Sequence, residues 1–332
     1  MSDRDWQHEV LSELGTLEAG LFPPHPLPPL TPLRTNPPPP APLPAPVPRS
    51  ETPPARPTPG GQRNPHGDRA IKRLGRSMRK AVGASATTGE RDRSELTAQL
   101  SVPVRSCRRI AVMSIRDGAG KSSIAALLAR TIQQHRDDRV LAIDADPGLG
   151  ALPRRLGVAG QTSSLQSIIA ARPRSWAEAS PHLAHTETGV WVLGAQELTH
   201  DAYRSGAGLL SRYFSVAIID CSTGIGSPLH QSILSSAHAQ VFVVPGTQDG
   251  AVSAQAALHH LQENGHNPVV ALVAHTPDAR DLLNTDAIIV PFDRHLETGT
   301  TITPDRVGAA THTAIARIAA ESFGRAQREG TL

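Results

Sequence analysis

The stretch that decides the fold is Ser114-Ile-Arg-Asp-Gly-Ala-Gly-Lys-Ser-Ser123. It follows an apolar segment at 110–115 with the length of a buried strand, and it opens an amphipathic segment at 121–135 with helical spacing. A glycine-rich turn between a strand and a helix is the setting in which backbone N–H groups wrap around a phosphate. Gly118 and Gly120 permit the tight curvature, and the helix N-terminus adds partial positive charge. This stretch, the P-loop, therefore predicts a phosphate-binding site.

The side chains of the P-loop match the needs of a nucleotide bound with magnesium. Lys121 is expected to reach the β- and γ-phosphates, and the Ser122 hydroxyl to take one coordination position on Mg²⁺. Lys121 is also the only lysine between residues 111 and 332, against sixteen arginines. A chain so rich in arginine that keeps one lysine here indicates a need for a compact ammonium. The predicted nucleotide contacts in the loop are Asp117, Gly118, Ala119, Gly120, Lys121, Ser122 and Ser123.

Acidic residues at the ends of two other expected strands support the loop, which lacks the first glycine of the general GxxxxGK[ST] pattern. The strand at 140–144 leads into Asp144 and Asp146, and the strand at 216–220 ends on Asp220. Ligands in open α/β sheets collect at the carboxyl ends of strands. Each aspartate alone is better explained as a helix cap or loop residue, but together with the P-loop they favour a magnesium site. The predicted metal ligands are Ser122, Asp146 and Asp220.

The chain after residue 109 predicts an α/β fold. Short apolar segments alternate with helical ones, which indicates a mostly parallel sheet flanked by helices on both faces. The final helix is expected at 307–323. The expected strands are 110–115, 140–144, 190–193, 216–220, 241–245, 269–274 and 287–291.

The N-terminal third predicts an arm rather than a core. Residues 1–22 read as a short acidic amphipathic helix, interpreted either as a solvated tail or as a docking segment for a protein partner. Eighteen of the 30 prolines lie in residues 21–60, so 23–66 are expected to be a disordered, extended linker. The predicted domains are therefore 1–22, 23–66, a basic and partly helical connector at 67–108, and an ATPase domain at 109–328.

Positive charge is concentrated in the connector. Residues 61–110 carry twelve Lys and Arg against four acids, whereas residues 111–332 carry seventeen against twenty. The segment 69–80 combines an apolar stripe with basic residues, a pattern that fits DNA, an anionic membrane surface or packing on the neighbouring domain. Of these, packing on the domain is the favoured interpretation, because Gly75 weakens a free-standing helix.

The sequence indicates a cytoplasmic protein. The first ten residues are acidic and lack an apolar stretch, which opposes a signal peptide, and no run has the ~18–20 apolar residues of a membrane span. Cys107 and Cys221 stand alone, a pattern that suits a reducing compartment. The basic segment leaves open a peripheral position at the inner face of the membrane.

Residues 109–324 resemble the MinD/ParA group of P-loop ATPases. The loop at 116–122 is similar to that family's deviant Walker A motif, KGGxGK[ST]. Residues 140–147 resemble its switch I segment and residues 220–224 its switch II segment. The resemblance implies ATP and Mg²⁺ as cofactors, with Asp146 orienting the attacking water and Asp220 near the metal. The implied catalytic residues are Lys121, Asp146 and Arg116.

Residues 289–293 resemble the family segment that lies beside the adenine, which implies nucleotide contacts from Pro291, Phe292 and Asp293. His275 stands near the place of the usual asparagine after the sixth strand. The proline-rich arm, the basic segment and the ATPase in this order also resemble the MinD-like proteins of actinobacterial type VII (ESX) secretion, the EspI type. That narrower resemblance implies an ATP-dependent switch or regulator in secretion or protein positioning.

Two departures from the family pattern bear on activity. Arg116 replaces the signature lysine that reaches across a nucleotide-sandwich dimer, and Asp117 replaces the following glycine. The added carboxylate favours weak hydrolysis and crowds the face of an ATP-dependent homodimer. A nucleotide-stabilised scaffold with little hydrolysis is therefore the first alternative, and a ParA-like DNA partition ATPase is the second.

Overall fold

The computed structural model describes residues 94–146, 150–160, 162–194, 198–274, 282–283 and 285–329. The predictions for the acidic segment 1–22, the proline-rich linker 23–66 and the basic segment 69–80 lie outside these residues, as does His275. The domain boundaries stay predictions. In the described part of the connector, residues 94–100 form a helix whose Leu100 is fully buried in the core.

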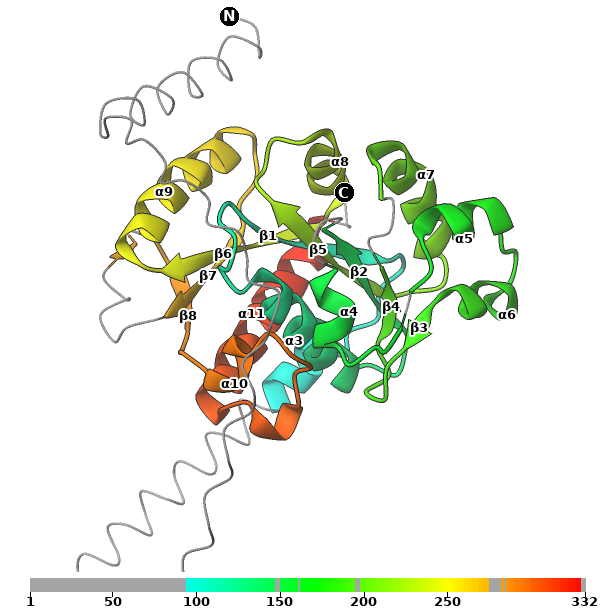
Figure 1. The fold of residues 1–332 in the computed structure, drawn as a ribbon, viewed down its shortest axis with the longest axis horizontal. Helices are drawn as coiled ribbons and strands as arrows, with labels where there is room; N and C mark the ends of the chain where they lie inside the picture. The colour runs from blue at the N-terminus through cyan, green and yellow to red at the C-terminus, as the bar shows by residue number, and fades with distance from the viewer. Residues whose placement is uncertain are drawn as a thin grey trace, which may run out of the picture. The chain divides into compact units, whose positions relative to one another are not determined.

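An eight-stranded sheet forms the centre of the fold, with the strand order β3-β4-β2-β5-β1-β6-β7-β8 (Figure 1). Every pairing in it is parallel except the antiparallel pair β3–β4 at one edge. The expected mostly parallel α/β sheet is confirmed. The strands are β1 (Arg108–Ser114), β2 (Val140–Ala145), β3 (Ala184–His185), β4 (Trp191–Leu193), β5 (Val216–Thr223), β6 (Ala239–Gly246), β7 (Val269–Ala274) and β8 (Ala287–Val290).

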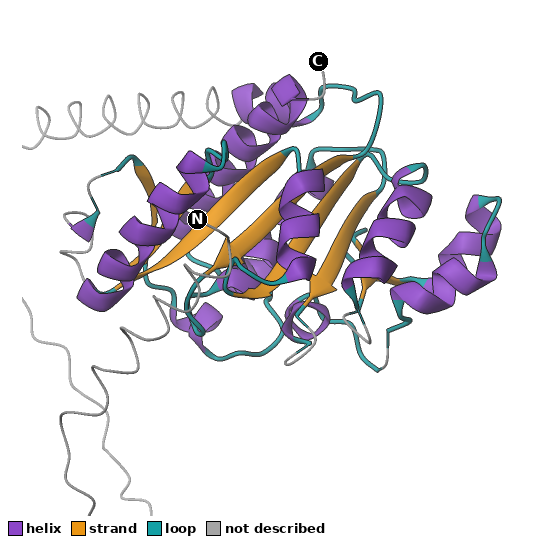
Figure 2. Cartoon of the chain, turned by 90° about the horizontal axis from the view of Figure 1, so that it is seen from above, coloured by secondary structure: helices purple, strands orange, loops and turns teal. Residues whose placement is uncertain are grey.

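Helices cover both faces of the sheet (Figure 2). The longer helices are α3 (Lys121–Gln134), α7 (His200–Ser211), α8 (Pro228–Ser236), α9 (Gln248–Glu263) and α11 (Ala309–Glu329). The shorter ones are α4 (Ala151–Arg155), α5 (Leu165–Ala171), α6 (Trp176–Ala179), α10 (Arg294–Glu297) and the 3₁₀ turns η1 (Ser180–His182) and η3 (Pro304–Arg306). No helix in the described part of the chain is both long and apolar enough to cross a bilayer.

Two cores result from the alternation of side chains along the buried strands. On β1, Ile110 and Val112 face the core built with α3 and α11, whereas Ala111 and Met113 face the core built with α7, α8 and α9. This period of two is what a strand buried on both faces imposes. The sheet is therefore held rigidly from both sides, and its carboxyl edge is a stable platform for a site.

Three details differ from the sequence prediction. β5 does not end at Asp220 but continues to Thr223, because Thr223 pairs with Ser114 of β1 beyond an irregularity in that ladder. β3 was not expected, since two residues carry no readable periodicity. The last helix is α11, which runs to Glu329 rather than ending at residue 323.

Gly250 in the first turn of α9 offers a test of this packing. A Cβ added there would lie 2.4 Å from the Pro245 carbonyl oxygen, which is backbone and moves only with β6. We expect Gly250→Ala to destabilise the fold by about 1–3 kcal/mol, measured by urea unfolding. Gly208→Ala is the matched control, because the exposed Gly208 of α7 has nothing within 4 Å of an added Cβ. That change is expected to be neutral or to stabilise by up to about 1 kcal/mol; equal unfolding midpoints for the two variants would contradict the packing.

Candidate nucleotide-binding site

A pocket of about 430 Å³ opens where the P-loop meets α4, β7, β8 and α10. Its size falls within the range of ~300–1,000 Å³ usual for small-molecule sites. The residues of the sequence prediction that line it are Arg116, Asp117, Gly118, Ala119, Gly120, Lys121, Ser122, Ser123, Asp146, Pro291, Phe292 and Asp293. The fold thus brings the P-loop, the switch I acid and the segment after β8 to one cavity, although they lie far apart in the sequence.

The P-loop has the backbone that a phosphate cradle needs. Gly118 and Gly120 adopt positive φ angles of 72° and 91°, the left-handed region that L side chains rarely enter. Ala119 between them is buried, and Gly120 directly precedes the first turn of α3. The turn therefore delivers the chain from β1 into a helix whose N-terminal N–H groups face the cavity region.

Lys121 lies between two carboxylates. Its Nζ is 3.8 Å from Asp146 Oδ2 and 3.8 Å from Asp220 Oδ1. Lys121 is 7% exposed and Asp220 is fully buried, so both charges lie in a low-dielectric setting. One ammonium shared by two carboxylates leaves excess negative charge, which a cation arriving with the ligand can balance.

Asp220 is the part of the site that most needs a partner. Both of its carboxylate oxygens are buried and lack a hydrogen bond of normal geometry within the described residues, although the Ser122 hydroxyl lies near enough to act on its charge. Burial raises the pKa of Asp220 to about 7, opposed by Lys121 and Ser122. A buried, unsatisfied carboxylate costs free energy unless a cation or ordered water meets it. Asp220 and Ser122 therefore fit magnesium, which keeps several waters and uses one or two carboxylates together with phosphates.

No cluster of three or more His, Cys, Asp or Glu side chains suited to a metal occurs among the described residues. Asp144, which the sequence pattern grouped with the acids of the expected magnesium site, has a backbone role that the pattern did not indicate. Its Oδ1 accepts from the Asp146 backbone N–H at 3.0 Å and its Oδ2 from the Leu152 N–H at 3.2 Å. Asp144 therefore fixes the backbone on both sides of the switch I loop.

The raised pKa of Asp220 predicts a pH effect on the nucleotide-free protein. Its folded value of about 7 lies above the ordinary value of 3.8, so folding is favoured below pH ~4 and that contribution is lost as the pH rises through ~7. Asp220→Asn removes this loss. We expect the variant to be more stable than wild type by roughly 1–3 kcal/mol at pH 8 and to match it near pH 4. Thermal unfolding across that pH range with a chelator present measures it; a pH-independent difference would contradict the assignment.

The segment after β8 forms the other wall. Phe292 is 49% exposed, which leaves its ring available to an aromatic ligand. Asp293 is already engaged: its Oδ1 accepts from the His295 N–H at 2.9 Å and its Oδ2 from the Gly308 N–H at 2.8 Å. These backbone hydrogen bonds hold the pKa of Asp293 below its ordinary value despite the opposing effect of partial burial. Its carboxylate caps α10 in this structure, so a ligand contact from residue 293 would use its backbone.

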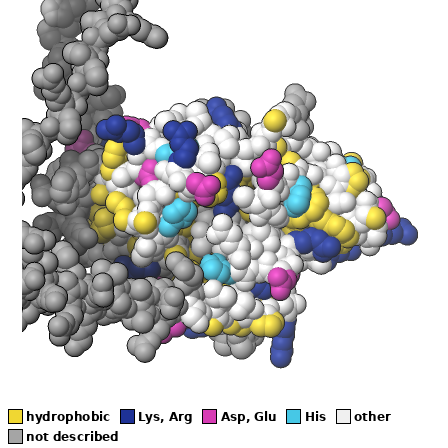
Figure 3. All heavy atoms as spheres, turned by 90° about the horizontal axis from the view of Figure 1, so that it is seen from below, with side chains coloured by type: hydrophobic (Ala, Val, Ile, Leu, Met, Phe, Trp, Pro, Cys, Tyr) yellow, Lys and Arg dark blue, Asp and Glu magenta, His cyan; other side chains and the backbone are white. Residues whose placement is uncertain are grey.

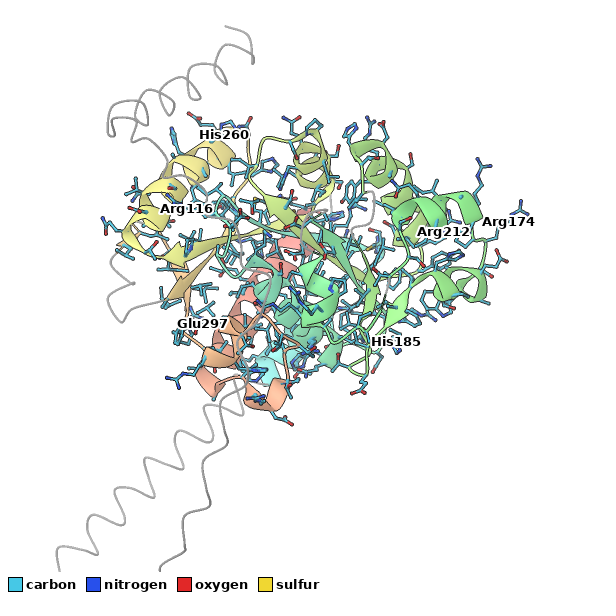
Figure 4. The ribbon with its side chains drawn as sticks, in the orientation of Figure 1. Arg116, Arg174, His185, Arg212, His260 and Glu297 are labelled. Atoms are coloured by element: carbon cyan, nitrogen blue, oxygen red, sulfur yellow. The ribbon has the colours of Figure 1, made fainter. Side chains whose placement is uncertain are left out.

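Arg116 and Asp117 point to other partners than the sequence prediction gave them. The Arg116 guanidinium donates to Ser253 Oγ at 2.8 and 3.3 Å and to the Asp249 carbonyl at 3.4 Å, both in α9. Figure 4 shows Arg116 on the side of the molecule where α9 lies. Asp117 accepts a hydrogen bond from the Thr223 hydroxyl at the end of β5. The P-loop is thus tied to α9 on one side and to the switch II segment on the other. A role of Arg116 in catalysis stays a prediction.

The fold and this site define a P-loop nucleotide-binding protein of the α/β class. The chain belongs to the CobQ/CobB/MinD/ParA nucleotide-binding domain family, whose profile matches residues 110–293. The chain is 27% identical over 276 residues to the ESX-1 secretion-associated protein EspI of Mycobacterium tuberculosis. That match covers 74% of this chain but 41% of the relative, so the chain spans about two fifths of the curated relative's length.

Solved structures agree on the fold. A ParA family ATPase from Chlorobium tepidum TLS superposes with a TM-score of 0.55 at 17% identity, covering 64% of this chain and 98% of that one. The MinC:MinD cell division protein complex of Aquifex aeolicus matches with a TM-score of 0.54 at 20% identity, covering 66% of this chain and 96% of that one. The expected MinD/ParA membership, with its resemblance to the EspI type, is confirmed.

Proposed function

We propose that this protein is an ATP-dependent switch. ATP bound with Mg²⁺ in the P-loop pocket sets the two switch segments, and hydrolysis releases them. The observation that carries the proposal is the position of Lys121 between the carboxylates of Asp146 and Asp220. Both carboxylate oxygens of Asp220 are buried and lack a hydrogen bond of normal geometry within the described residues. That arrangement is costly for stability, and a nucleotide–magnesium complex supplies both the phosphates for Lys121 and the cation for Asp220.

Each residue has a defined task in this proposal. Ser122 and Asp220 hold the metal, which neutralises charge on the transferred phosphoryl group when it is bound. Lys121 turns from the two carboxylates toward the phosphate oxygens. Asp146, freed from Lys121, holds the attacking water, and the Phe292 ring contacts the adenine. Asp144 keeps the switch I backbone in register during this exchange, because it binds the N–H groups of Asp146 and Leu152.

A nucleotide-stabilised scaffold with little turnover is the second candidate. It is favoured by the Arg116 contacts to α9 and by the Asp117–Thr223 hydrogen bond, because both bind the P-loop to other parts of the same chain. Both contacts occupy groups that a face-to-face dimer would need to rearrange. In this version ATP stabilises the fold and sets the surface of the switch segments without release of phosphate.

Phosphate release combined with static light scattering, each with and without ATP–Mg²⁺, separates the two candidates. The switch predicts phosphate release that requires Lys121 and is accompanied by an ATP-dependent change in mass. The scaffold predicts a rise in unfolding temperature with ATP and a constant mass without phosphate release. If ATP changes neither the unfolding temperature nor the mass, the switch and the scaffold are both contradicted.

The cellular role is proposed from the similarity to the secretion-associated relative. We propose a regulator of type VII secretion or protein positioning in the cytoplasm, including its membrane face. A protein partner would meet the N-terminal arm. The basic segment 69–80, for which packing on the domain is the favoured interpretation, would otherwise supply contacts to membrane or DNA. On the folded part, basic and acidic side chains are interspersed over the uncovered area of one face (Figure 3), which gives DNA little uniform positive surface there.

A further inference from the structure

One wall of the pocket is built by α4, which no motif of the sequence covers. This five-residue helix follows the switch I loop, and its Leu152 N–H donates to Asp144 Oδ2. Its last two residues, Arg154 and Arg155, line the same pocket as Lys121. Two arginines are thus added to the pocket by the helix that directly follows the switch I loop.

Arg155 is held in place but not fully satisfied. Its Nη1 donates to the Leu296 carbonyl at 2.8 Å, which ties α4 to α10. Its Nε is buried and has no acceptor among the described residues. Burial and the neighbouring Arg154 lower the pKa of Arg155, while the charge of Asp220 raises it. The guanidinium therefore lies within electrostatic reach of the buried carboxylate and keeps an unused donor.

The charge of the pocket gives Arg155 its importance. Lys121 is shared between two carboxylates, and the guanidinium of Arg116 is bound to α9. A polyphosphate entering this cavity meets as many acids as bases, since the charged lining residues are Arg116, Lys121, Arg154 and Arg155 against Asp117, Asp146, Asp293 and Glu297. Besides Lys121, the half-buried cation of the pocket that can meet the ligand is Arg155 of α4.

We propose that Arg155 is a nucleotide-binding residue that grips the polyphosphate from the switch I side of the pocket. This inference rests on the proposed nucleotide-binding function. A planar guanidinium with a free donor suits phosphate oxygens, which it can bind through paired, charge-assisted hydrogen bonds. Arg155 belongs to the same chain as the P-loop, so this phosphate contact does not need the dimer that Asp117 opposes.

The same residue connects the ligand to a larger segment. The Arg155 carbonyl accepts from the Ile302 N–H at 2.9 Å, and the Arg154 carbonyl accepts from the Thr301 hydroxyl at 3.1 Å. Arg130 of α3 donates to the carbonyls of Ile302 and Leu156 and so holds the end of α4 and the segment at 301–302 together. A phosphate bound by Arg155 is therefore connected to switch I through α4. It is also connected through α10 to the wall formed by the segment after β8.

The test compares Arg155→Gln and Arg155→Lys with wild type, using the full chain. Arg174→Gln is the matched control, because Arg174 is exposed and lies far from Arg116 at the other end of the sheet (Figure 4). Dissociation constants for fluorescent ADP and ATP are measured with Mg²⁺, along with thermal stabilisation by tripolyphosphate and by adenosine. Unfolding without ligand checks that each variant is folded.

We expect Arg155→Gln to weaken ATP and ADP binding about 10- to 100-fold and to remove stabilisation by tripolyphosphate, while the response to adenosine stays as in wild type. Arg155→Lys keeps the positive charge but not the paired N–H donors of the guanidinium, so it should recover part of the affinity for ATP and ADP. If Arg155→Gln binds ATP like Arg174→Gln, or loses adenosine and ATP equally, the inference is overturned while nucleotide binding stands. If wild type itself binds no nucleotide, the proposed function fails first.

Discussion

Replacing Lys121 by alanine is expected to lower ATP affinity by roughly 100-fold or more, the largest effect of any single change in the chain. Lys121 is the one ammonium of the folded domain, and it lies at the first turn of α3 within 3.8 Å of both metal-side carboxylates. The other basic side chain of the P-loop, Arg116, is bound to Ser253 of α9, so Lys121 is the cation of the loop placed to meet the phosphates. Fluorescent-nucleotide binding in the presence of Mg²⁺ measures the loss.

The alanine variant also leaves Asp146 and Asp220 without their shared cation. Breaking a buried pair in this way destabilises proteins by about 3–5 kcal/mol, so lost binding could reflect lost folding. The double variant Lys121→Ala/Asp220→Asn also removes the buried charge of Asp220. Its stability at pH 8 is expected to rise above that of Lys121→Ala, while its affinity for ATP stays low. Wild-type affinity in a folded Lys121→Ala protein would rule out the P-loop as the nucleotide site.

Replacing Asp117 by glycine is expected to strengthen ATP binding about 10-fold and to raise ATP-dependent self-association and turnover. Asp117 lines the pocket, and a like charge several ångströms from the phosphates costs on the order of 1–2 kcal/mol. It also accepts a hydrogen bond from Thr223 and so ties the loop to switch II. The glycine variant removes both effects. Dissociation constants, phosphate release and light scattering measure the three outcomes.

Asp117→Asn separates the two causes. It removes the charge but keeps an oxygen that can accept from the Thr223 hydroxyl. Affinity should therefore rise as in the glycine variant, whereas self-association and turnover should stay near wild type if the Thr223 contact restrains the loop. Identical behaviour of all three proteins would show that Asp117 does not limit the site, and Arg116 on α9 would then be the restraint to examine.

The sheet and the P-loop could be predicted because their signals are local. β7 occupies 269–274 as its unbroken apolar run predicts, and Lys121 opens α3 where the glycine turn ends. The approach of Asp146 and Asp220 to Lys121 follows from the rule that ligands gather at the carboxyl ends of strands. Expecting β5 to stop at its aspartate was wrong, since the ladder with β1 continues past it to Thr223.

The contacts that restrain the site could not be predicted, because they join residues that are far apart in the chain. Arg116 meets Ser253 across 137 positions, Asp117 meets Thr223 across 106, and Arg155 meets Leu296 across 141. Each depends on how a helix or loop packs on the finished sheet. No periodicity or motif encodes the choice of partner, so the same arginines read equally well as solvated surface residues.

We expect this pocket to bind ATP with Mg²⁺ through Lys121 and Asp220. Calorimetric titration of the full chain with ATP–Mg²⁺ tests it most directly, with Lys121→Ala/Asp220→Asn as the folded control. We expect saturable binding at one site per chain in wild type and no measurable heat in the control. Absence of binding in wild type, or equal binding by the control, would contradict it.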